Sequence, residues 1–175
     1  MTSTARTESP VAVLDRPWRR PGRFGAVRQR IRTAVRPPVE VYPMPPDVVA
    51  RRDVPVVLRD GVTLRLNLFQ PASGGPFPVI LSAHPYGKDR VPTKRRRGWS
   101  INPQFRIMNQ HQPLRISDQT SWEAPDPAWW TQQGYAVVNL DTRGGGHSDG
   151  QGDLLSDQEA DDIAQVIEWI ADQPW

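Results

Sequence analysis

The chain has 175 residues, of which 37% are hydrophobic, 19 are proline and none is cysteine, and its formal net charge is +3. This length predicts a single domain with a sizeable core, while the proline content predicts much irregular backbone. The lack of cysteine excludes disulfides, a thiol nucleophile and thiolate zinc sites. No apolar run approaches the ~18 residues of a membrane span, and the arginine-rich start lacks the apolar segment of an export signal, so we expect a cytoplasmic protein.

Charge is distributed unevenly along the chain. Residues 1–117 contain 21 of the 22 basic residues and 7 acidic ones, whereas residues 118–175 contain 12 acidic residues and a single basic one, Arg143. Such polarity can mark contact with nucleic acid or a membrane at the basic end. No recognisable nucleic-acid-binding motif accompanies the arginines, so we expect neither partner. An unfolded arm, one arginine-rich loop and an acidic helix face account for the asymmetry.

Residues 1–46 are predicted to form a mostly disordered leader, rich in arginine, proline and small residues. A short basic helix could form within 27–35, but Pro37, Pro38 and the prolines that follow stop any longer regular element. We therefore assign the folded domain to residues 47–175.

Two alternating runs, 54–59 and 62–69, predict a β-hairpin in which Asp60-Gly61 is a two-residue turn. One face of the second strand carries four aliphatic side chains, those of Val62, Leu64, Leu66 and Leu68. A third apolar strand is predicted at 78–84.

Residues 89–125 are predicted to be a long irregular insertion, which in a compact domain is usually functional or disordered. A helix is predicted at 127–133. Asp126 suits its N-cap and Pro127 its first helical position, and Gly134 is expected to cap its carboxyl end.

A continuous apolar run at 135–140 predicts a parallel strand that is buried on both faces. The helix predicted at 157–172 has the clearest local signal, because Ser156 and Glu159 form a capping box. Its apolar stripe consists of Ala160, Ile163, Val166, Ile167 and Ile170. Its acidic residues could be read as metal ligands, but we predict a solvated helix surface and no metal site.

The string Gly146-His147-Ser148-Asp149-Gly150 matches the G-x-S-x-G motif of serine hydrolases. That motif works when the serine lies on a strained turn between a strand and a helix. Here the apolar run stops at Leu140, six residues precede His147, and several glycines surround the serine, so a flexible loop is predicted instead. We therefore predict that Ser148 is not a nucleophile.

A second motif, His84-Pro85-Tyr86-Gly87-Lys88, ends the strand at 78–84 and leaves Tyr86 at its carboxyl end, where open α/β sheets bind ligands. Together with the opening meander of strands and the Asp-x-Arg-Gly-x-Gly-x-Ser-x-Gly string that begins at Asp141, this resembles the cocaine esterase/NonD branch of the X-prolyl dipeptidyl-peptidase superfamily. The resemblance covers about residues 51–175. It implies an α/β fold, the N-terminal half of an α/β-hydrolase sheet with about four strands and two main helices.

The resemblance also implies a role for Tyr86, because members of that branch have a Pro-Tyr pair here whose tyrosine hydroxyl completes the oxyanion hole. A tyrosine at the edge of the core, with its hydroxyl in water, is the structural alternative. In the family the insertion lies near the substrate pocket, so four tryptophans could line that pocket or fill the core: Trp99, Trp122, Trp129 and Trp130. For Trp129 and Trp130, on the predicted helix, we expect core positions.

The family pattern continues with a strand and the nucleophile elbow, and α/β-hydrolases order their triad serine, acid, histidine. No residue of this chain is assigned to those positions, so the chain resembles the front of a larger enzyme, truncated before the elbow and inactive alone. The implied activity is serine acyl hydrolysis of a small ester or an X-prolyl peptide, without a cofactor. Two alternatives remain: a non-catalytic remnant that binds an anionic partner through its basic leader, and a small esterase that uses Ser148.

Other motifs are weaker. The glycines at 144–152 do not fit a dinucleotide-binding or Walker loop. Three histidines, His84, His111 and His147, lack the close pairing of a typical zinc site. Because the strand at 78–84 would have an unpaired edge without the following strand of the fold, we expect the isolated fragment to self-associate.

Overall fold

The computed structural model describes residues 22–108 and 113–175. Its main feature is a four-stranded sheet in the order β2-β3-β8-β4. These strands are β2 (Val48–Val57), β3 (Thr63–Pro71), β8 (Ala136–Asp141) and β4 (Val79–His84). β2 and β3 are antiparallel, as are β3 and β8, whereas β4 runs parallel to β8. This mixed sheet with helices confirms the predicted α/β class and all four predicted strands.

The hairpin between β2 and β3 has a longer turn than the sequence predicts. The N–H of Leu58 donates to the carbonyl of Val62, and the N–H of Gly61 donates back to the carbonyl of Leu58, both at 2.9 Å. Gly61 adopts a left-handed φ of 85°. Three residues rather than two therefore form the loop, which ends in a left-handed glycine, as is common in three-residue hairpin loops.

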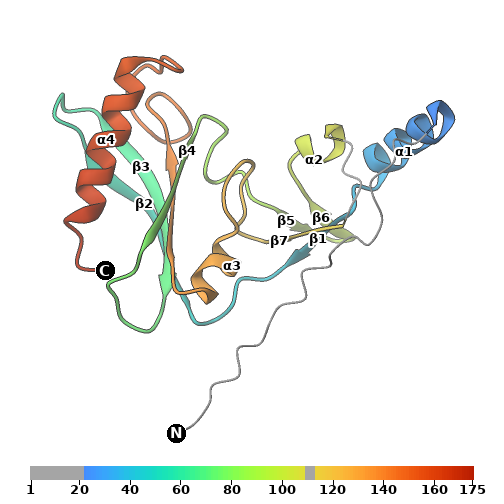
Figure 1. The fold of residues 1–175 in the computed structure, drawn as a ribbon, viewed down its shortest axis with the longest axis horizontal. Coiled ribbons are helices and arrows are strands. Elements are labelled where there is room, and N and C mark those ends of the chain that lie inside the picture. Colours follow the sequence, from blue (N-terminus) through green and yellow to red (C-terminus); the bar gives the residue numbers. More distant parts are fainter. Residues whose placement is uncertain (1–21, 109–112) are drawn as a thin grey trace, which may run out of the picture.

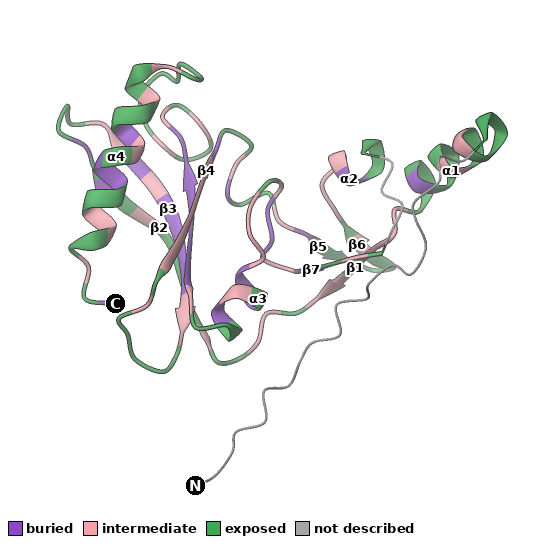
Figure 2. Cartoon of the chain, in the orientation of Figure 1, coloured by how far each residue is buried: buried purple, intermediate pink, exposed green. Residues whose placement is uncertain are grey.

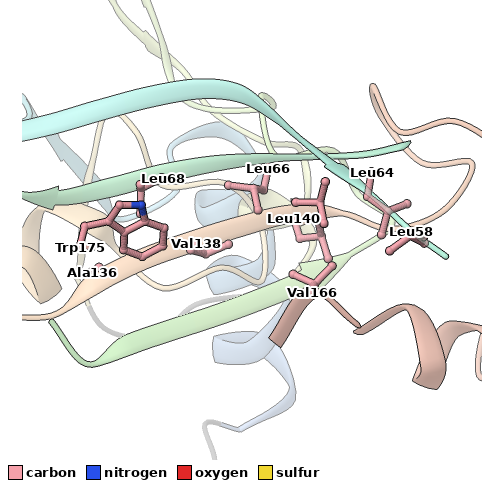
Figure 3. Close-up of a cluster of buried hydrophobic side chains, with 10 residues drawn as sticks. Leu58, Leu64, Leu66, Leu68, Ala136, Val138, Leu140, Val166 and Trp175 are labelled. Carbon is pink, nitrogen blue, oxygen red and sulfur yellow. The ribbon is translucent and has the colours of Figure 1, made fainter. Parts of the chain in front are cut away.

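One face of the sheet packs against the helix α4 (Asp157–Ala171). Figure 3 shows the aliphatic side chains of β3 and β8 pointing toward Val166 of α4 and Trp175. The strand side chains of this cluster have almost no exposure and include Leu64, Leu66, Leu68, Val138 and Leu140. Their spacing of two residues along each strand places them on a single face, as the alternation in the sequence predicts.

The amino end of α4 is capped as predicted, but the buried side of the helix differs from the predicted stripe. Ser156 Oγ accepts the N–H of Glu159 at 3.2 Å, and the Glu159 carboxylate accepts the N–H of Leu155 at 2.7 Å. Ile167 is 54% exposed, and Ala160 is exposed as well. The polar residues Asp162 and Gln165 are buried in their place, because Arg143 and the N–H of Arg59 supply partners for them.

The opposite face of the sheet is covered by α3 (Pro127–Gln132) and the segment before it. Asp126 caps this helix by accepting the N–H of Ala128 at 3.0 Å, and Gly134 follows it with a φ of 84°, both as predicted. The core position expected for Trp129 is wrong, since this residue is 46% exposed. Its indole instead meets Trp130 edge to face at 4.6 Å.

The basic leader contains more regular structure than predicted within the described residues. Helix α1 (Arg23–Val35) is followed by β1 (Val39–Tyr42), which pairs in parallel with β7 (Leu114–Ser117). The prediction of disorder is wrong for β1, because a strand 75 residues further along supplies hydrogen bonds that the local sequence cannot (the N–H of Leu114 bonds the carbonyl of Pro38). The helix α1 contains the short helix that the sequence allowed at 27–35. The boundary between leader and domain stays a prediction.

The insertion also contains short elements, namely β5 (Thr93–Arg95), β6 (Gly98–Ser100) and α2 (Gln104–Ile107). β5 and β6 form an antiparallel hairpin of their own, and Arg106 of α2 donates to the carbonyl of Ala34 at the end of α1. These elements form a separate lobe beside the main sheet (Figure 1). Within the described residues, no helix is both long and apolar enough to cross a membrane.

Candidate active site

Two loops meet at the carboxyl ends of the parallel strands β4 and β8. The first, after His84, carries the predicted site residue Tyr86, and the second covers residues 142–156 up to α4. Side chains from neighbouring parallel strands converge at such an end, which is where ligands of open α/β sheets bind. A Cβ added at Gly145 would come within 3.7 Å of the Pro85 Cα, so the two loops are in close contact.

Tyr86 lies on a tight turn with its side chain partly open to solvent. The residue is 38% exposed, and its ring stacks on that of His84 with centroids 6.0 Å apart. Gly87, the next residue, has a left-handed φ of 88° that favours glycine. Among the residues that the structure describes, no group accepts or donates a hydrogen bond to the Tyr86 hydroxyl, which is therefore available to a ligand. Its assignment as an oxyanion donor stays a prediction.

The carboxylate of Asp141, the last residue of β8, joins the two loops. Its Oδ1 accepts the N–H of Lys88 at 2.7 Å, and its Oδ2 accepts the N–H of His147 at 2.9 Å. Asp141 is 1% exposed. A Cβ at Gly146 would overlap this carboxylate, so the position tolerates only glycine. One buried side chain thus fixes the path of both loops.

Lys88 supplies the opposite charge. Its side chain is fully buried, and Nζ lies 2.6 Å from Asp53 Oδ1, 2.5 Å from Asp89 Oδ2 and 3.4 Å from Asp141 Oδ2. Burial alone would lower the pKa of Lys88, but the hydrogen bonds to Asp53 and Asp89 outweigh it, so that pKa is raised. The hydrogen bond from Lys88, and a second one from His147, lower the pKa of Asp53 to about 2. Lys88 is therefore a charged ammonium at neutral pH.

Asp53, Asp89 and His147 form the cluster of the described chain that comes nearest to a metal site. Their ligand atoms all lie within 4.8 Å of one another, and His147 Nδ1 is 3.0 Å from Asp53 Oδ1. The Lys88 ammonium already bonds both carboxylates, so a cation would have to compete with it. The sequence prediction of no metal site stays a prediction. His111, the third histidine considered, lies outside the described residues.

The Ser148 hydroxyl is engaged in hydrogen bonds that hold the fold. Its Oγ donates to the carbonyl of Asp141 at 2.6 Å and accepts the N–H of Arg65 at 2.9 Å, so it bridges the ends of β8 and β3. The adjacent His147 points its Nδ1 to Asp53 instead of Ser148. The residue lies in a loop between β8 and α4, as predicted. A serine with its hydroxyl engaged in this way, and with no base in contact, lacks the geometry of an activated nucleophile.

Another serine and histidine lie close together, which the sequence did not indicate. Ser121 Oγ is 3.4 Å from His84 Nε2, but both residues are buried, at 1% and 4% exposure. His84 Nδ1 has no partner among the described residues, so no acid orients the ring. Burial lowers the pKa of His84. Because a substrate cannot reach this pair, it does not form a catalytic dyad.

The sequence predicts a role for Tyr86, which stays a prediction, but it does not indicate the residues that hold the Tyr86 loop. Asp141 and Lys88 each belong to a motif described above, but neither motif indicates their role, and no pattern singles out Asp53. Asp141 carried a signal, as a charged residue directly after an apolar run, whereas Lys88 and Asp53 carried none. Trp122 was proposed for the pocket, and it packs edge to face on Phe105 in the insertion, with centroids 4.9 Å apart.

The mixed sheet, the parallel pair β4 and β8, and the loop site at their carboxyl ends define the front part of an α/β-hydrolase fold. Residues 60–175 match the family described as X-Pro dipeptidyl-peptidase (S15 family), and the chain belongs to this family. It is 33% identical over 123 residues to a cocaine esterase from Rhodococcus sp. (strain MB1 Bresler), which covers 70% of this chain. The structure is similar to a CocE/NonD family hydrolase from Staphylococcus aureus, with a TM-score of 0.63 and 35% identity over 73% of this chain.

The chain spans only a small part of these relatives, 17% of the cocaine esterase and 21% of the staphylococcal hydrolase. The family match over residues 60–175 includes the Tyr86 loop, Lys88, Asp141 and α4. It confirms the predicted family and fold.

Proposed function

We propose that residues 1–175 form the front part of a serine acyl hydrolase of the CocE/NonD type, in which Tyr86 donates a hydrogen bond to the oxyanion of the tetrahedral intermediate. The single observation that carries this proposal is the Tyr86 hydroxyl, which has no hydrogen-bond partner among the described residues and lies on a loop that Asp141 fixes at the carboxyl ends of two parallel strands. Donors that are held ready for a developing negative charge lower the barrier by about 3–4 kcal/mol in known enzymes.

The nucleophile, acid and base of this hydrolase would come from family segments other than residues 1–175. Within the described residues, Ser148 and Ser121 are the serines with a histidine beside them in sequence or in space, and neither has the environment of a nucleophile. The substrate would be a small ester or an X-prolyl peptide, hydrolysed without a cofactor. A cytoplasmic location remains part of the proposal and can be checked by cell fractionation.

A fluorophosphonate probe tests whether the nucleophilic serine lies outside residues 1–175. We expect no labelling of residues 1–175 alone, and labelling of the full-length gene product on a serine outside these residues. Stoichiometric labelling of Ser148 would favour the small-esterase alternative instead.

A substitution tests Tyr86 in the full-length enzyme. Tyr86→Phe removes one hydroxyl and little volume, so kcat should fall ~10²–10³-fold while the protein stays folded. Tyr135→Phe is the matched control, because Tyr135 lies directly before β8, at the end of the strand away from the Tyr86 loop, and packs on Trp130. Near-normal turnover of Tyr86→Phe would reduce Tyr86 to a structural residue.

A second candidate function, contact with an anionic partner, is favoured by the orientation of α1. Thr33 is the buried residue of this helix, whereas its large apolar side chains are exposed, namely Phe24, Val27, Ile31 and Val35. Arginines flank this stripe, as in helices that bind acidic surfaces. Arg28→Glu with Arg32→Glu should abolish any retention of the chain on an immobilised polyanion, and equal retention would exclude the helix as the contact.

Self-association of the isolated chain is a further part of the proposal. β4 lies at the edge of the main sheet and pairs on one side with β8, and its apolar residues Val79–Ala83 are only partly buried. An unpaired apolar edge favours pairing with another chain. Size-exclusion chromatography of residues 1–175 should give species larger than a monomer, and a sharp monomer peak with a cooperative melt would contradict this.

A further inference from the structure

The turn that carries Tyr86 is held at both ends by the same residue. His84, at the start of the turn, pairs with Asp141 in the β4–β8 ladder, and the N–H of Lys88, at its end, bonds Asp141 Oδ1 at 2.7 Å. Only three residues, Pro85, Tyr86 and Gly87, span the distance between these two anchors. Pro85 has a restricted φ, and the left-handed Gly87 reverses the chain, so little backbone freedom remains.

The anchor depends on charge compensation. The Asp141 carboxylate is buried at 1% exposure, and a buried charge is costly unless it is paired and hydrogen-bonded. Lys88 Nζ, 3.4 Å from Asp141 Oδ2, is the cation that compensates it. Asp53 and Asp89 hold that ammonium in place from the other side, at 2.6 and 2.5 Å. Lys88 therefore contributes twice, through its backbone N–H and through its side chain.

We infer that Lys88 and Asp141 are positioning residues that place the Tyr86 hydroxyl for catalysis. This inference rests on the proposed role of Tyr86 and adds the two residues that fix the position of the Tyr86 turn. A misplacement of about 1 Å can cost ~10²-fold in rate, so a loosened turn should reduce turnover even though neither Lys88 nor Asp141 touches the substrate.

The test is a double-mutant cycle in the full-length enzyme. Lys88→Met retains the length of the side chain and removes its charge, and it should lower kcat about 10–100-fold with a smaller change in KM. In the Tyr86→Phe background the same substitution should have little further effect, because the hydroxyl that it misplaces is already absent. Equal losses in both backgrounds would overturn the inference, since a general loss of stability acts regardless of Tyr86.

Arg143→Met is the matched control. Like Lys88, Arg143 is a mostly buried cation that pairs with carboxylates, here those of Asp60 and Asp162, but it ties the β8 loop to the hairpin and α4. Its substitution should reduce stability, and any effect on kcat should be independent of Tyr86. If Lys88→Met does not fold, Asp53→Asn replaces it, because Asp53 is half-exposed and its loss weakens the hold on Lys88 more gently.

Hydrogen–deuterium exchange separates this inference from the function on which it rests. Lys88→Met should increase exchange in peptides that cover residues 84–91 and 142–150, whereas Arg143→Met should affect the second peptide and not the first. Unchanged exchange at 84–91 would overturn the positioning role, whatever Tyr86 does. Normal turnover of Tyr86→Phe alone would overturn the proposed function, and the positioning inference with it.

Discussion

The two faces of the main sheet are buried by different means. The face toward α4 consists of aliphatic side chains, which need only a complementary shape and the exclusion of water. On the other face, beside the apolar Phe69 and Val137, three polar residues of the two central strands have at most 1% exposure: Asn67, Asn139 and, at the carboxyl end of β8, Asp141. Each polar atom there requires a particular partner, and the Asn139 amide has none among the described residues. Figure 2 shows β8 buried along its whole length, although its alternate residues face these two environments.

This difference teaches that an apolar face specifies the fold and a polar face specifies a site. Buried polar groups contribute little net stability when satisfied and cost much when left unpaired. A network such as that of Asp141, Lys88 and Asp53 is therefore a sensitive part of the molecule. Because this network lies at the carboxyl ends of β4 and β8, a substitution in it should also disturb the turn that carries Tyr86.

The largest effect is expected when the polar face is broken. Asp141→Ala leaves the backbone N–H groups of Lys88 and His147 without their acceptor and removes the buried carboxylate beside the Lys88 ammonium, so the free energy of unfolding should fall by about 3–5 kcal/mol. Urea unfolding followed by tryptophan fluorescence measures this change. Asp149→Ala, an exposed carboxylate on the same loop, is the control. A loss below ~1 kcal/mol would refute the central role of Asp141.

The neighbouring residue on the apolar face should respond to volume alone. Leu140→Ala should cost about 2–5 kcal/mol through lost burial and a residual cavity, while the volume-conserving Leu140→Met should cost less than ~1.5 kcal/mol. The equally isosteric Asp141→Asn should not be tolerated in this way, because an amide cannot accept at both positions and carries no charge. Equal tolerance at residues 140 and 141 would erase the distinction between the faces.

On the polar face, His84 should make the free energy of unfolding depend on pH. Burial lowers the pKa of this imidazole below its ordinary 6.5, so the folded state binds its proton less readily than the unfolded state. Stability should therefore fall as the pH decreases below about 6.5, as the unfolded state takes up the proton. His84→Asn should reduce this dependence in urea titrations across that range. An unchanged pH profile would contradict the assignment.

The smallest effect is expected on the outer side of α4. Ile167→Ser should change the free energy of unfolding by less than ~0.5 kcal/mol, because Ile167 is 54% exposed, whereas the buried neighbour Val166 should cost more than ~1 kcal/mol when replaced by Ser. Thermal melts of the two variants make the comparison. A large loss of stability for Ile167→Ser would show that Ile167 is buried, as the stripe predicted from the sequence requires.

The sequence by itself determined the elements whose signal is local. The alternation of β3, the continuous apolar run of β8 and the capping residues Ser156 and Asp126 each depend on neighbours a few residues away, and all were predicted correctly. The end of the apolar run at Leu140 and the glycines around Ser148 likewise predicted the loop in which Ser148 lies, whereas the role of Tyr86 stays a prediction. Such patterns suffice because backbone geometry imposes their period.

Tertiary structure alone decided the features that depend on distant partners. The pairing of β1 with β7, the burial of Asp162 in place of Ile167, and the meeting of Asp53 with Lys88 each join residues far apart in the sequence. A charged residue reads as exposed until its partner is known, because burial is favourable only once that partner is in place. For this reason the sequence could indicate the residue proposed for the chemistry, while the network that holds it emerged only from the fold.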